Sequence, residues 1–243
     1  MSNNRIVQGL WIDGNMSSLQ LLCIKSFMAN GHDFHLYTYN EKINAPVGTI
    51  IKSADSIINK EEIFFDDKNS LSAFSDMFRY ELLYKNGGWW VDMDVVCLKS
   101  FDFDSEYVFS SEHDCNFRYN PNIGVIKVPP LSDIMNYCRN MAHEILYTNR
   151  TNVEWGGLGS KILISYFRKH ELMKQHIQLP HIFCPIPYFY FNFLFNDILF
   201  DFNQNSYSIH FWNEMLRRNK IDLNTKFHPY SMFQRLKKMY NME

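Results

Sequence analysis

The clearest pattern of apolar and polar positions in the chain is a helix followed by a short buried strand. The predicted helix has an apolar face at helical spacing, formed by Leu71, Phe74, Phe78 and Leu82. The Asn-Gly-Gly sequence at residues 86–88 ends the helix. From Trp89 the residues are aromatic and β-branched, which is typical of a buried strand, and this strand ends at Asp92 and Asp94.

The N-terminal pattern predicts an α/β fold with parallel strands. Residues 5–12 and 32–39 have strand character, and residues 19–27 between them have helical spacing. Ligands of such sheets bind beyond the carboxyl ends of the strands, so Trp11 is expected near a nucleotide.

The remaining elements follow from shorter patterns. A third strand is expected at 48–51, with a helix starting near Ser53 or Asp55. Further strands are expected at 107–110 and 123–127, and further helices at 131–146 and 161–168. Residues 182–202 are strongly aromatic, and prolines interrupt them, so we interpret them as a buried strand plus a lid or as an interfacial patch. Residues 232–240 form a basic amphipathic helix that packs on the domain or touches a membrane.

Size and charge limit the possible functions. With 243 residues and 46% hydrophobic content, the chain is expected to form one domain, residues 1–243. Residues 1–149 carry a net charge of −7 and residues 150–243 one of +5. The basic half would face an anionic acceptor or a membrane surface, while the lack of a dense basic stripe excludes nucleic acid as a partner.

The cysteines and the N-terminus bear on location. Five cysteines without regular spacing indicate reduced thiols. No signal peptide and no apolar run long enough for a bilayer span are present in the sequence, so we expect a cytoplasmic enzyme, or one peripheral on the inner face of the cell membrane.

Carboxylates near the predicted strand end suggest metal chemistry. In an extended chain Asp92 and Asp94 point to the same side, which suits a hard divalent cation such as Mn²⁺ or Mg²⁺. Asp76 and Arg79 share a helix face and would add a hydroxyl acceptor and a charged donor. Each motif alone is also common in solvated helices and turns.

Taken together, these motifs resemble a known family. The segment S-D-x-x-R-Y-x-x-L-x-x-x-G-G-x-x-x-D-x-D resembles the sugar-binding core of family 32 glycosyltransferases and, more distantly, of the clostridial glucosylating toxins. The resemblance implies a GT-A-type, Rossmann-like fold with a mixed central sheet and a helical, aromatic C-terminal region. It also implies that Asp76 and Arg79 contact the donor sugar, while Asp92 and Asp94 hold the metal and the ribose or sugar.

Further residues take candidate roles from the same resemblance. Trp11, in W-I-D-G where the relatives have W-I-G-G, would stack on the nucleotide base. Asn122, in N-I-G-V, would bind the donor sugar. His210 and Trp212 match a late H-x-W motif, whose first residue lies at the metal and whose Trp lies at the leaving phosphate. Glu154 and Trp155, where the relatives have G-P-x-x-[LF] nearby, would border the acceptor pocket.

The implied division places nucleotide binding in residues 1–100, ending in D-x-D, and the acceptor half with the closing segment in residues 101–243. The expected enzyme is a retaining, metal-dependent transferase. It would move a hexose or N-acetylhexosamine from a nucleotide diphosphate sugar, a UDP-sugar, to an oligosaccharide or lipid-linked glycan of bacterial surface polysaccharide.

Three alternatives stay open at this point. An effector-type enzyme would glycosylate a protein instead of a glycan. A phosphohydrolase of the haloacid dehalogenase type also uses D-x-D after a strand, but its motif belongs on the first strand. A non-catalytic sugar-binding protein would use the same residues without turnover.

Overall fold

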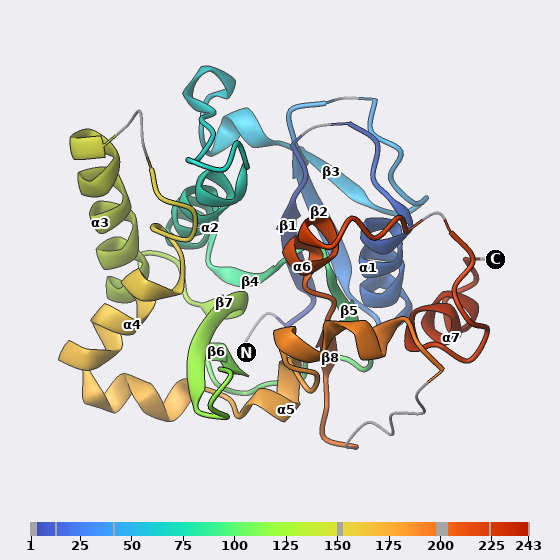
Figure 1. Cartoon of the computed structure of the whole chain (residues 1–243). Coiled ribbons are helices and arrows are strands. Elements are labelled where there is room, and N and C mark those ends of the chain that lie inside the picture. Colours follow the sequence, from blue (N-terminus) through green and yellow to red (C-terminus); the bar gives the residue numbers. More distant parts are fainter. Residues whose placement is uncertain are drawn as a thin grey trace.

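The computed structural model describes residues 4–12, 14–40, 42–149, 153–197, 204–223 and 225–242 (Figure 1). A six-stranded mixed sheet has the order β3-β2-β1-β4-β7-β6. The strands are β1 (Ile6–Leu10), β2 (Asp33–Thr38), β3 (Ile50–Ser53), β4 (Gly88–Val91), β6 (Val108–His113) and β7 (Tyr119–Val128). The first four are parallel, whereas β7 is antiparallel to β4 and to β6. The predicted α/β fold with a mixed sheet is confirmed.

Helices cover both faces of this sheet. They are α1 (Ser18–Ala29), α2 (Ser72–Asn86), α3 (Asp133–Asn149), α4 (Ser160–Lys169), α5 (Pro180–Phe183), α6 (Asn213–Arg218) and α7 (Met232–Met239). Figure 1 shows α2, α3 and α4 on one side of the sheet and α1 and α7 on the other, and each side has its own buried apolar cluster. The buried side chains of α7 are part of the apolar cluster on the α1 side of the sheet. The apolar face of α7 therefore packs on the rest of the protein.

The end of α2 determines where the D-x-D segment lies. Gly87 follows the helix with φ of 62°, a left-handed conformation that favours glycine. A Cβ at this position would lie 2.5 Å from the backbone nitrogen of Pro130. Glycine is therefore required for the chain to turn from α2 directly into β4.

A second, two-stranded sheet brings a distant segment to the same place. Strand β5 (Val95–Cys97) pairs antiparallel with β8 (Ser208–His210), and Val95 is opposite His210. This pairing places His210 beside the D-x-D segment although the two are far apart in the sequence.

Several expectations about local structure are corrected. The strand predicted to carry both acidic residues ends at Val91, and Asp92 to Asp94 form a turn in which the Val95 amide donates to the Asp92 carbonyl over 3.0 Å. The turn arises because the chain leaves β7 at this point and pairs with β8 instead.

Two predicted elements have a different form. Near Ser53 only a 3-10 turn forms, Ala54–Ser56, and the aromatic segment contains α5 and a 3-10 helix, Tyr188–Leu194, where we expected a strand. Prolines at 185 and 187 interrupt any ladder there, since proline donates no backbone hydrogen bond. The part of that prediction on residues 198–203, and the Asp13 position, lie outside the described residues. Within the described residues, no helix has the length and apolar character needed to cross a bilayer.

Candidate functional site

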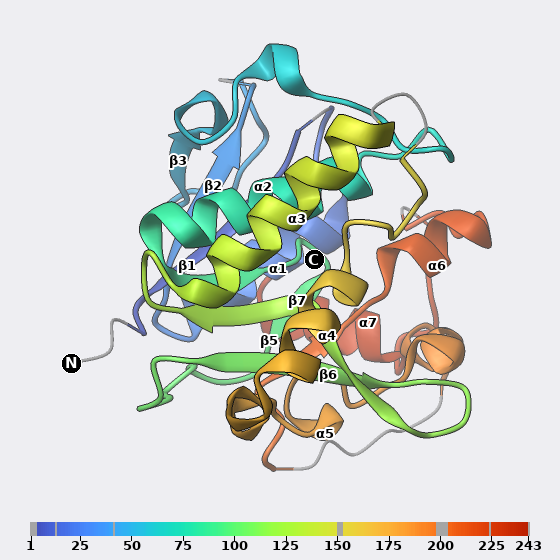
Figure 2. The ribbon, with the colours of Figure 1, turned by 90° about the vertical axis from the view of Figure 1, so that its left-hand side faces the viewer.

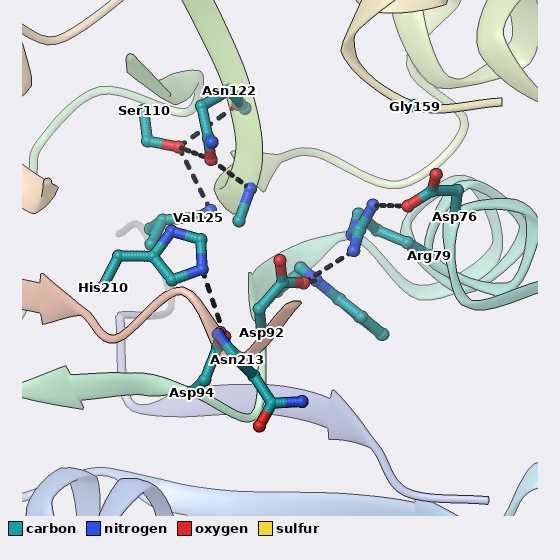
Figure 3. Close-up of polar contacts among 12 residues, drawn as sticks. Asp76, Arg79, Asp92, Asp94, Ser110, Asn122, Val125, Gly159, His210 and Asn213 are labelled. Atoms are coloured by element: carbon teal, nitrogen blue, oxygen red, sulfur yellow. Dashed lines mark hydrogen bonds and ion pairs between the residues drawn. The ribbon is translucent and has the colours of Figure 1, made fainter. Parts of the chain in front are cut away.

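The D-x-D turn and strand β8 form a cluster of three potential metal ligands. Carboxylate oxygens of Asp92 and Asp94 and a ring nitrogen of His210 lie within 4.8 Å of one another. Nε2 of His210 is 3.1 Å from Oδ1 of Asp94 (Figure 3). The structure thus brings together the three residues predicted as metal ligands.

Asp94 also anchors the segment that follows β8. Its Oδ2 accepts a hydrogen bond from the Asn213 amide over 2.6 Å, and its backbone carbonyl accepts from the Phe211 amide. Burial raises the pKa of the Asp94 carboxyl, but the charge and hydrogen bond of His210 and the bond from the Asn213 amide lower this pKa to below its usual value. Burial lowers the pKa of His210, and Asp94 raises it to well above its usual value.

The chemistry of this cluster suits a divalent cation. Two carboxylates and one imidazole are ligands that Mn²⁺ and, less readily, Mg²⁺ accept, and His210 would release its proton on binding. Gly124 of β7 keeps the space open, because a Cβ there would lie 3.1 Å from Cε1 of His210 and 3.3 Å from an Asp92 oxygen. The residues present therefore fit a metal.

A chain of buried ion pairs lies on the other side of Asp92. Arg79 donates from one guanidinium nitrogen to Oδ1 of Asp76 over 2.7 Å and from the other to Oδ1 of Asp92 over 2.6 Å. The indole N–H of Trp90 donates to the same Asp92 oxygen over 2.9 Å, and the Arg79 guanidinium lies 4.9 Å from the centre of the Trp90 ring. Asp76 and Arg79 are thus fixed side by side, as predicted from their helical spacing.

The surroundings of Asp76 and Arg79 on α2 have different effects on the pKa of each side chain. Burial raises the pKa of Asp76 to about 6, more than the Arg79 charge lowers it. Arg79 shares its positive charge between two carboxylates, and these carboxylates raise its pKa despite burial. The pKa of Asp76 therefore lies well above that of an ordinary carboxyl group.

A cavity of about 350 Å³ opens over these groups. Trp11, Asp76, Arg79, Asp92 and Asp94 line it together with residues of α6. A second cavity, of about 570 Å³, shares Ile12 and Leu71 with the first and extends past the end of β2. A larger one, of about 690 Å³, is lined by Gln8, His35 and Lys127, and none of the predicted site residues borders it.

Trp11 lies at the end of β1, where the sequence analysis expected it. Its backbone amide donates to the Tyr37 carbonyl, and its half-buried ring lines the first cavity. The indole N–H donates to the Gly14 carbonyl over 3.2 Å. The ring position is compatible with stacking on a base, which stays a prediction.

Asn122 is buried on β7 close to the cluster. Its side-chain oxygen accepts from the Gly124 amide over 2.6 Å and from the Ser110 hydroxyl over 3.2 Å. These bonds fix its orientation (Figure 3).

Trp212 follows β8 in a left-handed conformation, with φ of 55°. Its ring stacks on His210 with centroids 3.9 Å apart, and its indole N–H donates to the Ile186 carbonyl over 2.8 Å. A contact with a leaving phosphate stays a prediction, and it would require this N–H to exchange its partner.

The glycine-rich loop borders the ion-pair chain. A Cβ at Gly159 would lie 3.2 Å from Oδ2 of Asp76, and Tyr80 donates its hydroxyl proton to the Leu158 and Gly159 carbonyls. The Trp155 ring contacts two cations: its centre is 4.8 Å from Nζ of Lys68 and 4.5 Å from the guanidinium carbon of Arg218. Trp155 therefore links this loop to α6 through Arg218.

Sequence reasoning missed the contribution of α6. Glu214 and Arg217 line the cavity, and Arg217 donates to Glu214 from two nitrogens over 2.8 and 2.9 Å. Two arginines in a row after Trp212 gave no signal, because adjacent charges on a surface helix are ordinary. The hydrogen bond from the Asn213 amide to Asp94 helps to hold this helix at the cavity.

Comparisons with known proteins agree with this geometry. Residues 17–111 match the family model of the glycosyltransferase sugar-binding region containing the DXD motif. The matched part runs from α1 into β6, and it contains both the ion-pair chain and the D-x-D turn. No curated protein matches the sequence.

Solved structures show a similar fold. PaToxG glycosyltransferase aligns over 68% of this chain and 68% of its own, with 17% identity and a TM-score of 0.51. The glycosyltransferase domain of the YGT toxin aligns over 72% and 79%, with 8% identity and a TM-score of 0.47. A transferase mutant aligns over 74% and 92%, with 11% identity and a TM-score of 0.48.

The fold is therefore of the GT-A type, and the resemblance to the DXD sugar-binding glycosyltransferases is confirmed. The family match over residues 17–111 indicates a transferase enzyme.

Proposed function

We propose that the protein transfers a hexose or N-acetylhexosamine from a UDP-sugar to a glycan hydroxyl. The observation that carries this proposal is the arrangement around one cavity: a three-ligand cluster, a buried Asp-Arg-Asp chain and an aromatic ring at a strand end. The cluster is suited to the diphosphate, the ion-pair chain to sugar hydroxyls and the ring to the base.

Each residue has a proposed part in binding. Trp11 stacks on the uracil, Asp76 accepts from a sugar hydroxyl, and Arg79 donates to the sugar while it holds Asp92 in place. Asp92, Asp94 and His210 hold the metal, Mn²⁺ or Mg²⁺, which supplies positive charge to the departing diphosphate. Asn122 orients the sugar.

The closing segment contributes the last groups. Trp212 stacks on His210 and so fixes the imidazole plane, and it is the predicted donor to the leaving phosphate. Arg217 lines the cavity and adds a guanidinium on the phosphate side. Retention of configuration at the sugar is proposed from the family resemblance.

For the acceptor we propose an oligosaccharide or lipid-linked glycan of bacterial surface polysaccharide, used on the cytoplasmic side, with residues 1–243 acting as one domain. Five unpaired cysteines support a reducing compartment. Transfer to a protein side chain is the competing acceptor class.

The test is diphosphate release from a panel of UDP- and GDP-sugars with Mn²⁺. We expect metal-dependent release confined to one donor, and loss of release in Asp94→Asn. Phosphatase activity on simple phosphate esters, without release from any donor, would overturn the proposal in favour of a hydrolase.

A further inference from the structure

A carboxylate outside the predicted site lies beside Asn122 and close to His210 of the metal cluster. Glu112 lies near the end of β6, opposite Asn120 of β7. Its neighbour Ser111 donates to the Gln178 carbonyl, so strand alternation directs Glu112 to the other face. There it accepts a hydrogen bond from the Asn122 side chain and lies within the electrostatic range of His210.

The surroundings of Glu112 are those of a polar group at the edge of a cleft. It is partly buried, and burial raises its pKa while the His210 charge lowers it. Burial raises the pKa of Tyr188, and Glu112 is among the nearby charges that raise it further. None of the roles described above uses this carboxylate.

Aromatic side chains continue from this point to the surface. We call Phe117, Tyr188, Phe189 and Tyr190 the aromatic ledge. The Tyr188 ring packs edge-on against Trp212, with the ring centroids 6.2 Å apart. The centroid of the Phe189 ring is 5.3 Å from that of Tyr188, 4.7 Å from that of Tyr190 and 5.7 Å from that of Phe117.

The ledge is exposed at its outer end. Phe117 at the tip of the β6–β7 hairpin is 60% exposed, and Tyr190 is 40% exposed. Figure 2 shows the hairpin tip beneath the segment that contains Tyr188–Leu194, on the same side of the molecule as α6. The ledge is thus continuous with the reacting end of the site through Trp212 and His210.

The chemistry of this surface favours a sugar ring. Aromatic faces stack against the C–H face of a pyranose, and a partly desolvated carboxylate accepts hydrogen bonds from its hydroxyls. The charged groups nearby are Glu112, Asp114 and Arg118, and because Arg118 is paired with Asp114 the net charge of the three is negative. An anionic lipid surface would require cations here, so a membrane contact is disfavoured.

We propose that Glu112 and the aromatic ledge form the acceptor subsite and bind one pyranose ring, with a ring hydroxyl donating to Glu112. This proposal rests on the proposed glycosyltransfer and names its acceptor class. It places the acceptor on the β6–β7 side, away from Glu154 and Trp155, which the family resemblance suggested.

The test is saturation-transfer NMR with methyl glycosides of glucose, galactose, mannose and N-acetylglucosamine, in the presence of UDP and Mg²⁺. We expect at least one glycoside to bind the wild type. Glu112→Gln and Tyr190→Ala should each weaken that binding by about fivefold or more, while UDP affinity changes by less than about twofold.

Two variants serve as matched controls, because they alter the same residue types elsewhere. Glu171→Gln changes an exposed carboxylate paired with Lys174, and Tyr147→Ala removes an exposed ring on α3. Neither should alter glycoside binding. No binding of any glycoside, or equal binding by all variants, would overturn the acceptor subsite, whereas absence of metal-dependent UDP binding would overturn the proposed function itself.

Discussion

The two carboxylates of the D-x-D turn are neighbours, but different parts of the chain hold them. On the Arg79 side, Asp92 is bound by Arg79 and Trp90, which precede it by fewer than fifteen residues. On the His210 side, Asp94 is bound by His210 and the Asn213 amide, which come from the far end of the sequence.

This difference between the Arg79 side and the His210 side indicates that the D-x-D turn contributes both to folding and to metal binding. The Arg79 side is built into α2 and β4, inside a buried cluster that forms with the main sheet. The His210 side depends on a three-residue pairing between β5 and β8. We therefore expect changes on the first side to affect stability most, and changes on the second to affect metal binding and closure.

The largest effect is expected from breaking the His210 side. Asp94→Asn removes one metal ligand and the charge that faces His210, so diphosphate release should fall by about 10³-fold. Steady-state assays over a Mn²⁺ titration measure this. Asp33→Asn, which alters an exposed carboxylate paired with Arg5, is the control. Activity near the wild-type level in Asp94→Asn would contradict the metal assignment.

Breaking the Arg79 side should instead lower the free energy of unfolding. Arg79→Met leaves buried Asp76 and partly buried Asp92 without their cation, at a cost of about 3 to 5 kcal/mol. Urea unfolding measures the change. The control Arg5→Met disrupts an exposed ion pair and should cost less than about 1 kcal/mol. Equal losses in both variants would show that the buried chain contributes no special stability.

A smaller effect should separate two arginines on α6. Arg217 lines the cavity, whereas Arg218 lies over the Trp155 ring, and both pair with Glu214. Arg217→Gln should raise the KM for the donor by about tenfold, since a phosphate contact is lost. Arg218→Gln should change it by less than about twofold. If the two variants behave alike, Arg217 has no direct contact with the donor.

The contrast between the two sides also explains what the sequence could predict. The Arg79 side was predictable because it lies in one helix-turn-strand segment, where the spacing of Asp76 and Arg79 sets their common face. His210 was predictable only through the family resemblance, since local patterns do not state that β8 pairs with β5. The turn at Asp92 was missed because it results from that same long-range pairing.

Residues with no local signal were missed for a related reason. Glu112 and Arg217 are ordinary charged residues in the sequence, and only the packing of β6 against β7, and of α6 above Asp94, places them at the site. The aromatic segment was predicted as a strand from its composition, but its prolines and its contacts with Trp212 favour a 3-10 helix.

The finest test of the comparison is the pH dependence, because Asp76 and Asp94 have pKa shifts of opposite direction. Burial raises the pKa of Asp76 from 3.8 to about 6, so its contribution to stability is present below 3.8 and is lost as pH rises through about 6. The pKa of Asp94 is lowered, so its contribution is present above 3.8 and is lost only as pH falls through the lowered value.

Of these two carboxylates, therefore, only Asp76 should change its contribution between pH 7 and 5. In the metal-free protein, the free energy of unfolding of the wild type minus that of Asp76→Asn should increase as pH is lowered through this window, as urea unfolding in EDTA measures. Donor kcat/KM should move the other way, falling by about tenfold per pH unit below about 6, because protonated Asp76 no longer accepts from the sugar hydroxyl. If the difference in unfolding free energy between the wild type and Asp76→Asn is constant from pH 7 to 5, Arg79 keeps Asp76 ionised in this range. The attraction between the two charges then offsets the effect of burial on the pKa of Asp76.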